Sequence, residues 1–128
     1  MNEVMEKTEA LIRKPINQPD EVRTFLDDKG RLSVFGVGGC TLGRGEFQPG
    51  WRWSMHVKPM AGTDSCKAAH TGIILSGKMC VHMDNGEEVT YQEGDAFYMP
   101  PGHDAWVVGD QPCMLIDFTG AEHYAVKH

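Results

Sequence analysis

The stretch that decides the fold is "GDAFYMPPGHDAWVVGD", which runs from Gly94 to Asp110. Apolar residues at strand-like spacing stand on both sides of a Pro-Pro-Gly corner at 100–102, and His103 follows directly. Each proline ring fixes its φ angle, and glycine permits backbone conformations that other residues avoid. The pattern predicts two short strands, 95–100 and 105–109, joined by a stiff corner that holds a histidine at its edge.

Outward from this corner, the chain from residue 31 onward has the pattern of an all-β domain. Asn85-Gly86 is a strong signal for a β-hairpin. In 51–57, "WRWSMHV", strict alternation predicts a strand with the two tryptophans and Met55 on one face and His56 on the other. Strands at this regular spacing favour a sandwich or a barrel, and the lack of a strand-helix-strand pattern argues against a parallel α/β fold. The predicted strands are 31–37, 40–47, 51–57, 70–77, 78–83, 87–91, 95–100, 105–109 and 113–118.

The two ends of the chain differ from this β-rich part. A short helix is predicted from Met5 to Lys14, ended by Pro15, and the polar segment 17–30 has the composition of turns. We expect residues 1–30 to form an N-terminal arm that packs on the domain or on a neighbouring subunit. The domain itself is predicted at 31–120, and the polar residues 121–128 are predicted to be a loose tail.

Composition limits the partners and the location of the protein. The 128 residues carry a net charge of −6, which argues against nucleic acid and anionic membranes because both attract clustered Lys and Arg. No apolar run approaches the roughly 20 residues of a membrane helix, and the N-terminus lacks an apolar signal core, so we expect a cytoplasmic protein. The four cysteines form no Cys-x-x-Cys pair and are expected to be free thiols in a reducing compartment. Cys40, Cys80 and Cys113 are predicted to be small buried residues, whereas Cys66 is a candidate ligand.

Six histidines are many for this length, and three of them fall at predicted strand ends or loop edges, where the mouth of a barrel would lie. Three imidazoles can hold a transition metal and leave a coordination position open. His82 alternates out of phase with its apolar neighbours and is expected to face solvent or another subunit. His123 and His128 lie in the tail and are not expected to be ligands. The candidate ligands are His56, His70 and His103.

The corner sequence resembles the second signature of the cupin superfamily, which runs Gly, five residues, Pro-x-Gly, two residues, His. Gly94 and the Pro-Pro-Gly of 100–102 match this frame. The family's histidine position is Ala105 here, and His103 stands two residues earlier. Along an extended chain these two positions face the same side, so His103 is expected to reach the same interior.

The first cupin signature, with its His-x-His, Glu and Gly, matches in part, and two alignments are open. Counting back six residues from Gly77 reaches His70, where the family usually has glutamate. Counting forward from Gly50 places His56 in the first histidine position, with Lys58 in the second. The usual short spacing before His70 instead places Cys66 in the second histidine position. Both alignments keep His70, and they differ over His56 and Cys66.

The resemblance covers about residues 32–118 and implies a double-stranded β-barrel, or jelly roll, and a homodimer. It also implies a metal at His56, His70 and His103, with Cys66 as a further ligand. Without glutamate, nitrogen ligands favour zinc, iron, nickel or copper over manganese, and an all-imidazole set favours an anionic partner. A Cys66 thiolate would strengthen the preference for zinc or copper, and as a fourth ligand it could leave the metal with no open coordination position.

Neighbouring residues suggest how a small molecule could bind. Arg52 and Lys58 share the predicted face of His56 and are candidates for holding a substrate carboxylate. Trp106 is a candidate for lining a pocket, and Asp104 is a candidate for orienting His103. We therefore expect a metal-dependent dioxygenase, isomerase or lyase that acts on a small carboxylate or an enolisable compound. The alternatives are a metal-binding or ligand-sensing module without catalysis and a barrel with a purely structural role.

Overall fold

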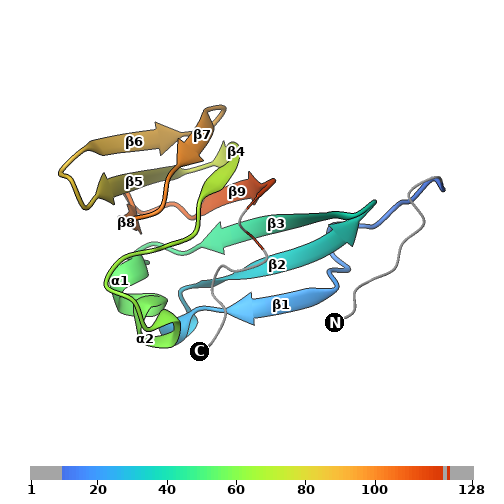
Figure 1. Ribbon diagram of the computed structural model, residues 1–128, viewed down its shortest axis with the longest axis horizontal. Coiled ribbons are helices and arrows are strands. Elements are labelled where there is room, and N and C mark those ends of the chain that lie inside the picture. The colour runs from blue at the N-terminus through green and yellow to red at the C-terminus, as the bar shows by residue number, and fades with distance from the viewer. Residues whose placement is uncertain (1–9, 120, 122–128) are drawn as a thin grey trace.

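The computed structural model describes residues 10–119 and residue 121. Within this part of the chain, nine strands form two antiparallel sheets (Figure 1). The larger sheet has the order β1-β2-β3-β9-β4-β7, and the smaller sheet has the order β6-β5-β8. The strands are β1 (Glu21–Thr24), β2 (Gly30–Val37), β3 (Cys40–Phe47), β4 (His70–Ser76), β5 (Lys78–Met83), β6 (Glu88–Gln92), β7 (Ala96–Met99), β8 (His103–Val107) and β9 (Cys113–Asp117).

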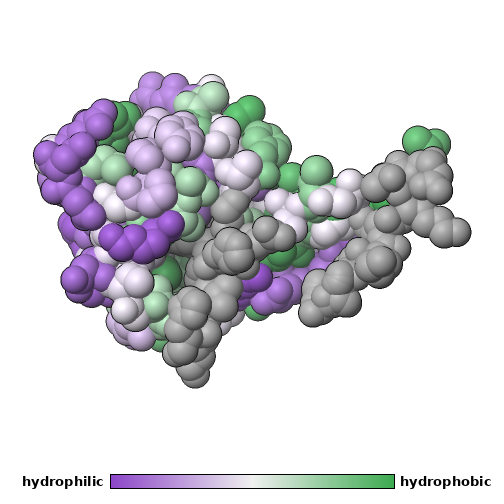
Figure 2. Space-filling view, viewed as in Figure 1, coloured by the Kyte–Doolittle hydropathy of each residue, from purple (hydrophilic) through white to green (hydrophobic). Residues whose placement is uncertain are grey.

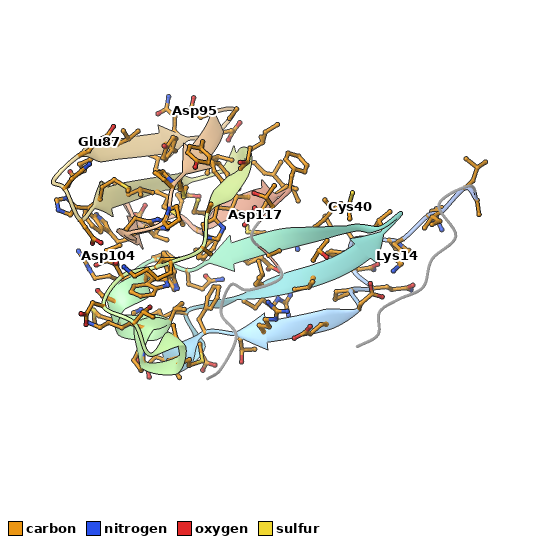
Figure 3. The ribbon with its side chains drawn as sticks, viewed as in Figure 1. Lys14, Cys40, Glu87, Asp95, Asp104 and Asp117 are labelled. Atoms are coloured by element: carbon orange, nitrogen blue, oxygen red, sulfur yellow. The ribbon has the colours of Figure 1, made fainter. Side chains whose placement is uncertain are left out.

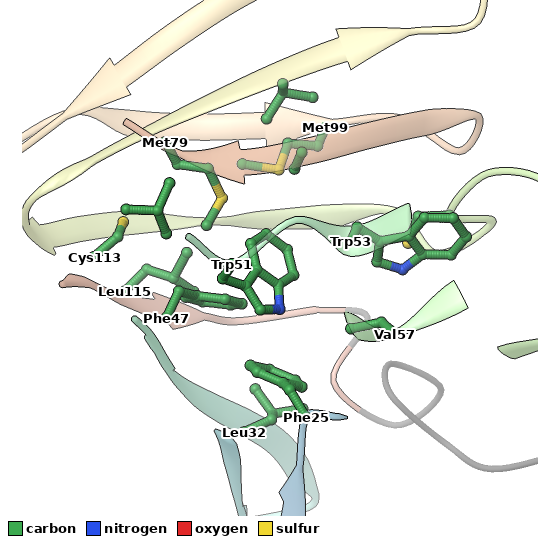
Figure 4. Packing of buried hydrophobic residues seen from close by; sticks show 14 of the residues in the cluster. Phe25, Leu32, Phe47, Trp51, Trp53, Val57, Met79, Met99, Cys113 and Leu115 are labelled. Carbon is green, nitrogen blue, oxygen red and sulfur yellow. The ribbon is translucent and has the colours of Figure 1, made fainter. Parts of the chain in front are cut away.

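The hydrophobic core takes side chains from both sheets. Leu32, Ile74 and Leu115 come from the larger sheet, and Met79 and Ala105 come from the smaller one. Figure 4 shows several of these residues packed around the buried tryptophans. Along β9 and β8, buried residues alternate with more exposed ones, as the period of two in a strand requires. The all-β prediction is confirmed, and the predicted hairpin at 85–86 joins β5 to β6.

The strand predicted at 51–57 is wrong, because the chain forms two short helices here. These helices are α1 (Trp53–His56) and α2 (Lys58–Ala61). A carboxylate oxygen of Asp104, on β8, accepts a hydrogen bond from the backbone nitrogen of Ser54 at 3.0 Å. This bond satisfies a donor in the first turn of α1, and the acceptor comes from a residue distant in the sequence. Tertiary contacts thus overrode the local alternation, and Met55 is exposed instead of sharing the buried face.

The segment 17–30 is more ordered than its turn-like composition indicated. β1 pairs with β2 over four residues, so part of the predicted arm belongs to the larger sheet. A short 3-10 helix (Leu26–Asp28) follows β1, and Phe25 between them is buried against the rings of Phe47 and Trp51. Most of the predicted Met5–Lys14 helix lies outside the described residues, and residues 11–14 are not helical.

Of the predicted tail, only Ala121 is described, and it is buried. Its carbonyl accepts a hydrogen bond from Arg23 at 2.7 Å, and its side chain lies against the interior face of β3 at Gly43. A Cβ at Gly43 would come within 2.9 Å of the Ala121 side chain, so this packing requires glycine. The rest of the predicted tail lies outside the described residues, so the expectation of a loose tail stays a prediction.

The surface combines polar loops with some exposed apolar side chains. Figure 2 shows hydrophilic residues over the side that carries the β5–β6 hairpin and apolar ones near β4 and β7. Ile73 and Leu75 are the exposed apolar residues of β4. Cys40 is also exposed, at the tip of the β2–β3 hairpin (Figure 3), which contradicts its predicted burial. No helix among the described residues has the length and apolar character needed to cross a membrane.

Replacement of Leu32 by alanine tests the position of the core. Leu32 is fully buried between the sheets, so Leu32→Ala is expected to lower the free energy of unfolding by about 2–5 kcal/mol in urea denaturation. Leu75→Ala is the matched control, since Leu75 is 45% exposed, and its effect should stay within about 0.5 kcal/mol. Equal losses from the two variants would contradict this arrangement of the sheets.

Candidate metal centre

Three buried side chains with metal-binding atoms lie close together in the structure: Cys66, His70 and His103. Their potential ligand atoms all lie within 4.8 Å of one another. The Cys66 Sγ is 3.7 Å from the His70 Nε2. A tetrahedral zinc ion about 2.3 Å from sulfur and about 2.0 Å from nitrogen would set these two atoms about 3.5 Å apart. The three side chains therefore stand close to the spacing that a transition metal requires.

Backbone hydrogen bonds fix these residues relative to one another. Cys66 and His103 form an isolated antiparallel bridge. In this bridge the Cys66 nitrogen donates to the His103 carbonyl at 2.7 Å, and the Gly102 nitrogen donates to the Cys66 carbonyl at 2.7 Å. Gly102 has a φ of 96°, which only glycine adopts readily. His70 begins β4 and His103 begins β8, so each sheet contributes one imidazole.

The orientation of both imidazoles is set through their Nδ1 atoms. The His70 Nδ1 is 2.5 Å from the carboxylate Oδ2 of Asp117, which is itself buried at the end of β9 (Figure 3). The His103 Nδ1 is 2.7 Å from the backbone carbonyl of Pro100. A carboxylate and a carbonyl can only accept, so each Nδ1 carries the proton. Nε2 is then the remaining ring nitrogen of each histidine, and that of His70 faces Cys66.

In the metal-free protein, the three side chains strongly affect each other's protonation. Burial raises the pKa of the Cys66 thiol, but hydrogen bonds with His103 and His70 outweigh burial and lower this pKa from 9.0 to about 6. Burial lowers the pKa of His70, but the contacts with Asp117 and Cys66 outweigh burial and raise it from 6.5 to about 9. Cys66 is therefore mostly a thiolate at neutral pH, which is the form that binds metals.

A small cavity adjoins the donor group. Its volume is about 30 Å³, and its wall includes His70, His103 and Asp117 together with apolar side chains such as Trp53 and Met99. A water molecule needs about 10–15 Å³ of such volume, so the cavity has room for about two. Both imidazoles thus belong to the donor group and to the wall of the cavity.

His56, the third histidine predicted as a ligand, is not part of this group. It ends α1, and its Nδ1 accepts a hydrogen bond from the backbone nitrogen of Arg52 at 3.0 Å. Its Nε2 lies 3.8 Å from a carboxylate oxygen of Asp27. The structure thus brings together Cys66 and His70, the residues of the alignment that used Cys66. His56 stays outside the donor group because α1 and α2 direct the chain away between His56 and that group.

The residues predicted to bind substrate do not line the cavity. The Arg52 guanidinium lies 4.2 Å above the ring of Trp106 and 3.6 Å from Asp104. Lys58 is 3.9 Å from Asp64, which is fully exposed. Their role in substrate binding stays a prediction, to which this cavity gives no support.

Asp104, predicted to orient His103, instead accepts hydrogen bonds from the backbone nitrogens of Ser54 and Ala105. The residue that does contact a histidine of the donor group through its carboxylate is Asp117, which sequence reasoning missed. The signal was present, since Asp117 follows Cys113 and Leu115 at a spacing of two in an apolar strand, and alternation places all three on the interior face. A carboxylate on a buried face needs a partner, and that requirement points to a site.

His82, the remaining histidine in the described part of the chain, is not a member of this group. His82 is partly exposed and forms a 3.0 Å contact with Glu88 on the neighbouring strand, in agreement with its predicted position facing outward. His123 and His128 lie outside the described residues.

Comparisons with known proteins identify the fold. A family model described as "Cupin domain" matches residues 43–119. An RmlC-like cupin from Shewanella frigidimarina is 18% identical, with a TM-score of 0.57 over 88% of this chain and 93% of its own. An oxalate decarboxylase of Lactobacillus farciminis in complex with formate is 18% identical, with a TM-score of 0.55 over 80% of this chain and 32% of its own. The iron(II) form of HppE is 7% identical, with a TM-score of 0.60 over 88% of this chain and 61% of its own. No curated protein matches the chain.

The protonation of Cys66 can be followed by the ultraviolet absorbance of its thiolate. In a Cys40→Ser background, which removes the exposed thiol, the metal-free protein should lose one thiolate as the pH falls through about 6. Burial raises the pKa of Cys80 and raises that of Cys113 to about 12, so both remain thiols in this range. Adding His70→Ala removes a group that stabilises the thiolate and should shift the transition to higher pH. A transition that stays in place after His70→Ala would contradict the described contacts.

Proposed function

Because the chain belongs to the cupin family, we propose that it binds a divalent transition metal through Cys66, His70 and His103. The two sheets are then the halves of the double-stranded β-barrel, or jelly roll, that the family resemblance predicted. The metal would lie where the larger sheet, through His70, meets the smaller sheet, through His103.

The observation that carries this proposal is the pair of hydrogen bonds at the Nδ1 atoms. Asp117 accepts from His70 and the Pro100 carbonyl accepts from His103, so the two Nε2 atoms are the ring nitrogens that would bind the metal, and His70 would release its Nε2 proton on binding. Metal-binding histidines commonly donate their other nitrogen to a carboxylate or a backbone carbonyl in this way. The nearby Cys66 supplies a thiolate, so the donor set has two nitrogens and one sulfur.

This donor set favours zinc, iron, nickel or copper, as the sequence predicted, because thiolate and imidazole are soft or borderline ligands. Within that group of metals, the thiolate strengthens the preference for zinc and copper. With His56 elsewhere, three protein ligands remain, and catalytic metal sites often have three protein ligands and one open position. The site is therefore proposed to be open and not closed by a fourth residue.

An open site supports the predicted enzyme, a metal-dependent dioxygenase, isomerase or lyase acting on a small carboxylate or an enolisable compound. When bound, the metal would supply Lewis acidity or an oxygen-binding centre. The protein would contribute the orientation of the imidazoles, through Asp117 and Pro100, and the exclusion of water by the apolar wall. Two similar structures, an oxalate decarboxylase with formate and an iron(II) protein, support metal or small-carboxylate chemistry on this fold.

A second candidate is a metal-binding or sensing module without turnover. The observation that favours it is the cavity of about 30 Å³, which is too small for most organic substrates. The same metal site would serve either function, and turnover by the metal-loaded protein distinguishes them.

The partners and the location of the protein remain proposals that derive from the sequence. They are a small-molecule ligand, a homodimer, a cytoplasmic location and the absence of nucleic-acid and membrane partners.

Metal content of the purified protein tests the proposed site. Protein purified without a tag or chelator should contain about one transition metal per chain. The variants Cys66→Ser, His70→Ala and His103→Ala should each lose most of it, because each removes one of three ligands. Elemental analysis after dialysis is the measurement.

Two other histidines provide the controls. His82→Ala removes an exposed imidazole from the neighbouring strand and should keep full metal content. His56→Gln tests the other alignment directly and should also keep the metal, provided that its circular dichroism spectrum matches that of the wild type. Wild-type protein without metal, or loss of metal in His56→Gln alone, would refute the proposed site.

A further inference from the structure

We propose that Asp84, in the turn that joins β5 to β6 (Figure 1), is a positioning residue for the metal site. Its carboxylate and its backbone hold the segment of Cys66 against the corner that precedes His103. The metal itself rests on the proposed function, whereas the contacts of Asp84 belong to the protein before any metal binds.

The first contact of Asp84 reaches the segment of Cys66 through the neighbours of that cysteine in the chain. Ser65, which directly precedes Cys66, is buried, and its Oγ donates a hydrogen bond to the Asp84 Oδ2 at 2.9 Å. Lys67, which directly follows Cys66, donates from its Nζ to the Ser65 Oγ at 3.1 Å. The same Nζ lies 4.0 Å from the Asp84 Oδ2. Both neighbours of the proposed ligand therefore converge on one carboxylate.

The second contact reaches the corner that precedes His103. The Asp84 backbone nitrogen donates to the Gly102 carbonyl at 2.8 Å. A Cβ at Gly102 would lie 3.1 Å from the Asp84 Oδ2, so this oxygen stands close to the Gly102 backbone. Asp84 thus contacts Gly102, the residue before His103, as well as Ser65, the residue before Cys66.

Cys66 is the proposed ligand that depends most on such support. His70 and His103 each begin a strand, whereas residues 62–69 form no helix and no extended strand between α2 and β4. The isolated bridge ties the Cys66 backbone to the corner, and Asp84 joins the same two segments through a side chain. Ligands on loops are held less precisely than ligands on strands unless neighbouring contacts fix them. Removal of the carboxylate is therefore expected to loosen Cys66 more than either histidine.

The turn that carries Asp84 is held by other groups. The Asn85 Oδ1 accepts a hydrogen bond from the Glu87 backbone nitrogen at 2.9 Å, and the Met83 backbone nitrogen donates to the Glu87 carbonyl at 2.8 Å. The Asp84 carboxylate is instead directed to the loop of Cys66. A change of metal affinity in an Asp84 variant would therefore report on that loop and not on the hairpin.

Cobalt(II) is a suitable probe, because a cobalt–thiolate bond gives a charge-transfer band in the near ultraviolet. Asp84→Ala is expected to weaken cobalt binding about tenfold, since contacts that support metal ligands are typically worth 10–100-fold in affinity. Asp84→Asn keeps an oxygen acceptor for Ser65 and should bind cobalt within about twofold of the wild type. Asp95→Ala is the matched control, because the Asp95 carboxylate accepts from the Gln92 backbone nitrogen in another turn, and it should keep wild-type affinity. Wild-type affinity in Asp84→Ala, or equal weakening in Asp84→Ala and Asp95→Ala, would overturn the inference.

Hydrogen exchange followed by nuclear magnetic resonance gives a test that needs no metal. The Cys66 amide donates to the His103 carbonyl, and its exchange should be roughly tenfold faster in Asp84→Ala because the loop opens more often. The Val107 amide, which donates to the Trp51 carbonyl, is the internal control and should exchange at the wild-type rate. Unchanged exchange at Cys66, or equal acceleration at both amides, would overturn the inference. Wild-type protein that binds no cobalt would instead refute the proposed function, and exchange would still show whether Asp84 holds Cys66, so the two failures are distinguishable.

Discussion

The contact between His70 and Asp117 is the constraint on which the rest of the site depends. It joins β4 to β9, two neighbouring strands of the larger sheet, and both side chains are almost fully buried. Loss of either partner would leave a polar or charged group without compensation in the core, which is strongly destabilising. The other Asp117 oxygen accepts from the Thr119 nitrogen, so the turn after β9 holds the carboxylate in place. The imidazole of His70 is thereby fixed before any ligand arrives.

The proposed metal would connect the larger sheet to the smaller sheet and to the segment of Cys66, which backbone hydrogen bonds already join to His103. His70 belongs to the larger sheet, His103 to the smaller sheet, and Cys66 to the segment after α2. Three rigid features position them: the Asp117 carboxylate, the corner at 100–102 and the backbone bridge from Cys66 to His103. Such preorganisation reduces the ordering cost of binding, and binding in turn stabilises the arrangement of the two sheets. The stability of the fold and the affinity of the site for metal are therefore expected to depend on each other.

The sequence predicted the strands well because their alternation reflects one buried face, and it placed His70 and His103 at strand ends. It failed at 51–57, where the capping of α1 by Asp104 depends on a contact 50 residues away. The choice between His56 and Cys66 required the path of the chain through α1 and α2, which alternation cannot supply. Asp117 could have been found, because a carboxylate on the interior face of an apolar strand needs a partner. Arg52 and Lys58 were assigned to a face that exists only if 51–57 is a strand.

X-ray absorption spectroscopy of the metal-loaded protein tests the central claim most directly, because it reports the elements bound to the metal. For zinc, we expect one sulfur at about 2.3 Å and two imidazole nitrogens at about 2.0–2.1 Å, with one further light atom in the open position. The sulfur signal should vanish in Cys66→Ser. A first shell of nitrogen and oxygen alone in the wild-type protein would contradict the account, because Cys66 would then play no part in holding the metal.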